Sequence, residues 1–76
     1  MNATKNISQL GLGESAALAG MSLPTAMCVR LNEMGLLPGE TIRLVRRAPL
    51  GCPLEFEVGG ARLAIRGIDA AQIFIQ

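Results

Sequence analysis

The 76-residue chain has no histidine, tyrosine or tryptophan, and its only lysine is Lys5. Acid–base and nucleophilic catalysis depend mostly on histidine, lysine, tyrosine or paired carboxylates, and no two acidic residues are expected to meet in a cleft. The segment Gly11-Leu12-Gly13 lacks the third glycine of a dinucleotide-binding fingerprint, and no Gly-Lys-Ser/Thr phosphate loop occurs. We therefore expect no enzymatic activity and no bound cofactor.

Aromatic residues are scarce, since Phe56 and Phe74 are the only two. Proteins that bind single-stranded nucleic acids stack the bases on exposed aromatic rings, but Phe56 is predicted to point into the core. The net charge of +1 provides no electrostatic footprint for a nucleic acid or an anionic membrane. The longest apolar run is far shorter than the ~20 residues of a membrane span. We expect a cytoplasmic protein that neither binds nucleic acid nor inserts into a membrane.

The two cysteines, Cys28 and Cys52, form neither a CxxC motif nor a disulfide framework. Without histidine, a zinc site with four ligands would need carboxylates from elsewhere or from a second subunit. We therefore predict no metal site and expect one cysteine to be a small buried residue and the other an exposed thiol. A metal-linked role and a redox role are the alternatives.

Half of the residues are apolar, and almost all of these are aliphatic. A chain of this length forms one small domain of marginal stability, to which formation of a homo-oligomer would add. Residues 1–6 are polar and lack periodicity, so they are expected to form a flexible arm. Residues 7–76 are expected to form the single domain.

A helix is predicted at about residues 23–34. Ser22 is the expected N-cap, and Pro24 fits the first turn, where no N–H is needed. Leu23, Met27, Leu31 and Met34 form one apolar stripe. Gly35 favours a left-handed end to the helix, and Pro38 prevents its continuation.

Short strands make up most of the remaining chain. Alternation predicts strands at 15–21, 41–47, 54–58, 61–65 and 73–75. Ile42 and Leu44 should face the core, and Ile73 and Ile75 should complete it. A helical turn capped by Asp69 is expected at residues 70–71.

The Gly59-Gly60 pair predicts a two-residue hairpin turn, because glycine adopts positive φ without steric cost. Such a turn determines which residues of the flanking strands lie opposite each other. The expected pairs are Val58 with Ala61, Glu57 with Arg62, Phe56 with Leu63, Glu55 with Ala64, and Leu54 with Ile65. The expected fold is mainly β: an SH3-like, partly open barrel with one inserted helix and a short C-terminal helical turn, with an OB-like barrel as the second choice.

Protein recognition is the function that these exclusions leave. Apolar side chains in turns are the best candidates, because no strand register turns them inward, and a joint patch beside two arginines would suit a protein partner. The candidate partner-binding residues are Leu36, Leu37, Arg46, Arg47, Pro49, Leu50, Cys52 and Pro53.

Two blocks of sequence resemble a known family. Arg-Leu-x-Glu-Met-Gly-Leu-x-Pro-Gly at residues 30–39, followed by Arg-Ala-Pro-Leu-Gly-x-Pro at 47–53, resembles the ferrous iron transport protein A family (FeoA). Leu63-x-Ile65-Arg66 and Ile73-x-Ile75 extend the resemblance to the end of the chain. Cys52 departs from the pattern, since this position is often acidic in the family.

The resemblance implies a small cytosolic SH3-like barrel without activity of its own. Such a protein would assist FeoB, the membrane transporter of ferrous iron, whose cytosolic part carries a GTPase domain. It would be cytoplasmic, and its partner would bring it to the inner face of the membrane. The expected function is to bind the cytosolic part of FeoB and modulate its activity or assembly.

Two alternatives involve a transition metal. Metal-dependent repressors of the diphtheria toxin repressor type carry a similar SH3-like domain, although this chain has no room for a helix-turn-helix before its barrel. A metallochaperone would bind the metal through Cys28 or Cys52 together with Glu33 or Glu40.

Overall fold

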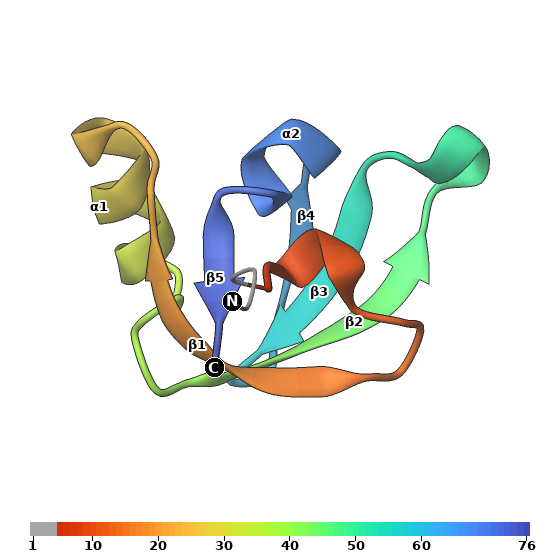
Figure 1. Cartoon of the computed structure of the whole chain (residues 1–76), viewed down its shortest axis with the longest axis horizontal. Coiled ribbons are helices and arrows are strands. Elements are labelled where there is room, and N and C mark those ends of the chain that lie inside the picture. Colours follow the sequence, from red (N-terminus) through yellow and green to blue (C-terminus); the bar gives the residue numbers. More distant parts are fainter. Residues whose placement is uncertain (1–4) are drawn as a thin grey trace.

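The computed structural model describes residues 5–76, which form a strongly curved antiparallel sheet and several short helices (Figure 1). The sheet has five strands in the order β4-β3-β2-β1-β5. The elements in chain order are η1 (Ile7–Gln9), β1 (Ser15–Met21), α1 (Thr25–Glu33), β2 (Thr41–Arg47), η2 (Pro49–Gly51), β3 (Leu54–Val58), β4 (Ala61–Ile65), α2 (Gly67–Ala70) and β5 (Ile73–Ile75).

The β3–β4 hairpin confirms the predicted register at all five pairs, from Val58 opposite Ala61 to Leu54 opposite Ile65. Gly59 and Gly60 have φ angles of +56° and +85°, as a turn with two left-handed central residues requires. Because side chains alternate along a strand, this register turns Phe56 and Leu63 toward the core together.

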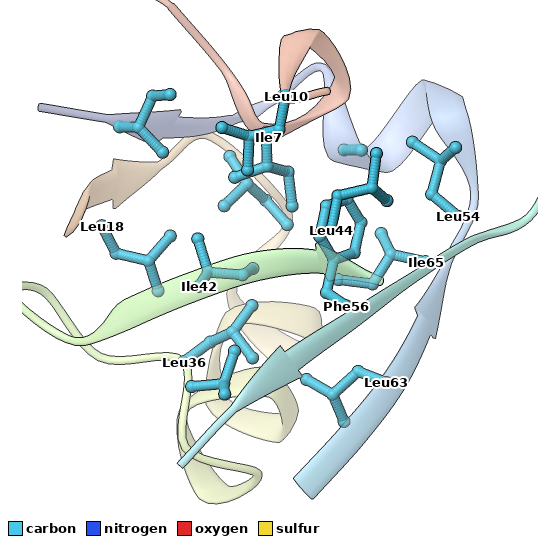
Figure 2. Close-up of a cluster of buried hydrophobic side chains, with 14 of the residues drawn as sticks. Ile7, Leu10, Leu18, Leu36, Ile42, Leu44, Leu54, Phe56, Leu63 and Ile65 are labelled. Carbon is cyan, nitrogen blue, oxygen red and sulfur yellow. The ribbon is translucent and has the colours of Figure 1, made fainter. Parts of the chain in front are cut away.

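The core is aliphatic around one aromatic ring, that of Phe56, which is fully buried (Figure 2). Phe56 lies opposite Leu44 of β2 and Leu63 of β4. The predicted inward positions Ile42, Leu44, Ile73 and Ile75 are all buried. The other buried residues are Ile7, Leu10, Leu18, Leu31, Leu36, Leu54, Val58, Leu63, Ile65 and Ala70.

The β2 strand contains an irregularity that changes the direction of its last residues. Its register with β3 shifts between Leu44 and Arg46, which leaves Val45 as the extra residue of a bulge. Arg46 therefore lies opposite Glu55 on the outer face, and its Nη1 donates to the Glu55 carboxylate at 2.6 Å. Arg43 and Glu57 form a second outer pair at 2.9 Å.

Helix α1 begins at Thr25, two residues later than predicted. Pro24, not Ser22, occupies the N-cap, and its carbonyl accepts from the N–H groups of Met27 and Cys28. A residue before proline avoids helical angles, so Leu23 stays outside the helix. The Ser22 N–H donates to the Gln72 carbonyl instead.

The predicted apolar stripe of α1 is only partly buried. Leu31 is buried, Leu23 and Met27 are half-buried, and Met34 is 44% exposed. The stripe therefore covers the core with its middle and leaves its C-terminal end accessible.

The predicted cap of the last helical turn is also wrong. Arg66 is the N-cap of α2, and Asp69 lies inside the helix. The half-buried Asp69 carboxylate is 3.6 Å from the exposed Arg66 side chain, with which it forms an ion pair. The helix begins earlier than predicted because Gly67 and Ile68 join it.

The chain is already paired before Ile7. The N–H of Ile75 donates to the carbonyl of Lys5 at 3.0 Å, and Asn6 forms a bridge with Phe74. Asn6 also caps η1. These two residues of the predicted arm are thus part of the fold, and residues 1–4 lie outside the described residues.

Substitutions at the two glycines of the hairpin turn should have different effects on the free energy of unfolding. Gly59→Asn creates an Asn-Gly turn and should be neutral or stabilising by up to about 1 kcal/mol. Gly60→Ala should cost about 1–2 kcal/mol, because alanine does not favour the φ of +85°. Urea unfolding of both variants measures the difference, and equal stability would contradict this account of the register.

Gly35→Ala should destabilise the protein by about 1–2 kcal/mol through backbone strain. Gly35 has a φ of +105°, and a Cβ there would meet only the Val58 side chain at an ordinary 3.9 Å. Gly20→Ala is the matched control, since Gly20 has no positive φ and its Cβ would have no neighbour within 4 Å. Thermal unfolding of the two variants should show a loss at Gly35 alone.

Candidate functional site

Leu36 does not belong to any surface, because its side chain is fully buried. The helix ends in a Schellman motif: the Gly35 N–H donates to Asn32 and the Leu36 N–H donates to Leu31, both at 3.0 Å. This motif places the residue after the glycine against the last helical turn. Leu36 consequently packs in the core near Leu31, and the expectation that its side chain is accessible in the turn is wrong.

Leu37 is exposed, but it lies far from the other candidates. Its side chain is 45% exposed in the turn before β2, whereas the loop with the remaining apolar candidates follows β2. Seven strand residues at about 3.3 Å each separate the two by about 20 Å. Figure 1 shows these turns at opposite ends of the strand. The predicted joint patch is therefore divided.

The candidates that do lie together form the tip loop, which we define as residues 49–53 between β2 and β3. Pro49, Leu50, Cys52 and Pro53 are all exposed. The Ala48 N–H donates to the Pro53 carbonyl at 3.1 Å, and the Gly51 N–H donates to the Ala48 carbonyl at 2.8 Å. These bonds close the loop at its base, so its shape does not depend on a partner.

Leu50 has the most unusual backbone of the described residues. It is the only described residue other than glycine with a positive φ, at +70°, and its side chain is 105% exposed. A left-handed conformation costs a leucine about 1–2 kcal/mol, and a fully exposed side chain returns none of this cost through packing. Strained backbone that does not serve the fold is common at functional sites.

Two contacts hold the tip loop and the end of β2 before it against the rest of the barrel. Nη2 of Arg47 donates to the Leu10 carbonyl at 2.8 Å, and the Gly67 N–H donates to Sγ of Cys52 at 3.4 Å. Arg46 is engaged with Glu55. The two arginines thus adjoin the loop, but each already has an intramolecular partner.

Sequence reasoning missed Ile68, which borders this surface. Ile68 follows Gly67, the residue that donates to Cys52, and its side chain is 76% exposed. In a helix of four residues no apolar periodicity can be recognised, so the sequence contained no signal for it. Leu12 is also largely exposed, at 66%, in the turn before β1.

The described residues contain no helix long and apolar enough to cross a membrane. Among these residues, no three histidine, cysteine, aspartate or glutamate side chains lie together as metal ligands would. Cys28 is half-buried and Cys52 exposed, and neither is in a disulfide.

Known proteins provide a clear match. Residues 5–76 match the FeoA domain model. Over 70 residues the chain is 30% identical to an Fe(2+) transport protein A/Fe(2+) transporter FeoB fusion protein of Porphyromonas gingivalis. This alignment covers 92% of the chain but only 8% of that relative.

Solved structures agree with this match. FeoA protein from Chlorobium tepidum superimposes with a TM-score of 0.88 at 32% identity, covering 93% of this chain and 70% of that one. Stenotrophomonas maltophilia FeoA complexed with zinc, described as a procaryotic SH3 domain protein, has a TM-score of 0.81 at 33% identity, covering 95% and 89%. The SH3-like fold and the family resemblance are both confirmed. Since the family model spans all of the described residues, the chain belongs to the FeoA domain family.

Proposed function

We propose that this chain is an accessory protein of ferrous iron uptake that binds the cytosolic part of FeoB and modulates its activity or assembly. The observation that carries the proposal is the relative in which a segment similar to this chain shares one polypeptide with FeoB. Fusion keeps two modules at a high effective concentration, which benefits modules that act on each other. This chain would reach the same arrangement by binding.

The tip loop is the surface that we assign to this contact. Burying the Leu50 side chain in a partner would gain about 1.5–3 kcal/mol, and the strained backbone has already been accommodated during folding. The hydrogen bonds of Ala48 and Gly51 hold the loop in shape before binding, which lowers the entropy lost on association. Pro49 and Pro53 add apolar area within the loop, Ile68 adds it next to the contact between Gly67 and Cys52, and Arg46 and Arg47 add charge at the base of the loop.

Modulation requires that the chain bind one conformation of FeoB more tightly than another. A rigid apolar tip suits this role, because it fits a pocket only when that pocket is open. Iron need not contact the chain. In this proposal the protein has no catalytic activity and works in the cytoplasm, at the inner face of the membrane through its partner.

Leu50→Asn should separate binding from stability. Asparagine tolerates left-handed angles better than leucine, so the free energy of unfolding should stay the same or rise. Affinity for the purified cytosolic part of FeoB from the same organism should fall at least about tenfold, or about 1.4 kcal/mol. Isothermal titration calorimetry and urea unfolding provide the two measurements.

Leu37→Asn is the matched control for this experiment. Leu37 is also an exposed leucine, but it lies at the other end of β2, so affinity should not change. Equal weakening by both substitutions would argue against the tip loop as the contact. If the parent protein does not associate at high micromolar concentration in either nucleotide state of the partner, direct docking is wrong.

A further inference from the structure

The two edges of the sheet differ in how they are covered. β4 and β5 are the outer strands. The free side of β5 is paired by Lys5 and Asn6, through the hydrogen bond from Ile75 and the bridge to Phe74. Over the described residues, no segment pairs with β4 in this way. Since proteins usually cover or blunt their sheet edges, an open β4 requires explanation.

The hairpin register shows which backbone groups of β4 are free. Val58 and Ala61 flank a two-residue turn and therefore exchange both backbone hydrogen bonds. Pairs of this kind alternate with pairs that do not exchange them, so Arg62 and Ala64 direct their N–H and C=O groups away from β3. Neither residue has another backbone partner within the described residues. The free edge thus presents two donors and two acceptors.

An apolar groove of about 280 Å³ runs between this strand and helix α1. Met27, Leu31 and Met34 of α1 line one side of it, and Leu63 and Ile65 of β4 line the other. Met34 is 44% exposed, although it continues the core stripe of the helix. The groove therefore lies where the side chains of an additional strand, paired with β4, would point.

The charges at the groove favour an acidic partner. Arg30 and Arg66 lie along it, and Asp69 is its one lining acid among the described residues, already paired with Arg66 at 3.6 Å. Arg62 lies opposite Glu57, but that carboxylate accepts from Arg43 at 2.9 Å. Within the described residues Arg30 and Arg62 form no ion pair, so two positive charges remain beside the free edge.

We propose that the β4 edge and this groove bind an extended segment of a partner protein, in which apolar and acidic residues alternate, as an additional strand. Main-chain hydrogen bonds to Arg62 and Ala64 would provide affinity, and side chains would provide specificity. Apolar side chains would fill the groove between β4 and α1, and the alternating carboxylates would point to the outer face and meet Arg62 across the strands. This surface is separate from the tip loop and does not depend on the proposed function.

The chain itself contains a sequence with the required pattern. β3 reads Leu-Glu-Phe-Glu-Val and pairs with β4 from the other side. The capped peptide Ac-Leu-Glu-Phe-Glu-Val-NH2 is therefore a suitable probe, and Ac-Leu-Arg-Phe-Arg-Val-NH2 is its control with reversed charge. Nuclear magnetic resonance titration of the ¹⁵N-labelled protein and amide hydrogen exchange report where each peptide binds.

The acidic peptide should shift the amide resonances of Arg62 and Ala64 and slow the exchange of both amides. Ala64→Pro removes an outward N–H at a position where proline is tolerated and should weaken binding at least about tenfold. Arg62→Glu changes a surface side chain and leaves the backbone hydrogen bonds between β3 and β4 intact. It should weaken binding of the acidic peptide by about tenfold and reduce the salt dependence of that binding. Leu50→Asn should leave peptide binding unchanged.

Four outcomes would overturn the proposal. The first two are equal affinity for the acidic and the basic peptide, and resonance shifts confined to elements other than β4 and α1. The third is unchanged peptide affinity in the Ala64→Pro and Arg62→Glu variants. The fourth is slow hydrogen exchange of the Ala64 amide in the protein alone at raised concentration. The last result would show that a second copy of the chain occupies the edge. Because FeoB binding is measured separately with Leu50→Asn, failure here would leave the proposed function untouched.

Discussion

The strand register set by the Gly59-Gly60 turn is the constraint on which the rest of the molecule depends. Strand side chains alternate, so a slip of one residue would turn Phe56 and its neighbours out of the core. With the observed register, Phe56 contacts both flanking strands and closes an aliphatic core that has no other buried aromatic ring among the described residues. The same register sends the backbone groups of Arg62 and Ala64 to the free edge. One turn thereby determines both the core and an outer surface.

Two leucines in turns illustrate how backbone geometry decides between core and surface. Leu36 follows a glycine that takes the left-handed position, and the Schellman bonds draw it inward. Leu50 takes the left-handed position itself and precedes a glycine with a φ of +87°. Its side chain is carried outward, away from anything it could pack against. The two residues are chemically identical, and the location of positive φ separates a buried leucine from an exposed one.

The two surfaces lie on different elements and could be occupied together. The tip loop presents a rigid apolar point, which suits a pocket on a folded domain. The β4 edge presents main-chain groups and a groove between cations, which suits an extended segment. A membrane transporter with a folded cytosolic part could engage the first, while the second would accept an extended acidic segment from any partner.

The sequence by itself determined the strands, the hairpin register and the left-handed end of α1, because these follow from local alternation and from glycine at positions that need positive φ. It also identified Pro49, Leu50, Cys52 and Pro53 as turn residues. Only the tertiary structure decided that Leu36 is buried, that Leu37 lies at the far end of β2, and that Ile68 is exposed beside the tip loop. Nothing in the sequence indicated the bulge at Val45. The same holds for the pairing of Arg43 with Glu57, which leaves Arg62 without an ion pair among the described residues. These depend on contacts between elements distant in the chain, and neither periodicity nor turn chemistry carries information about them.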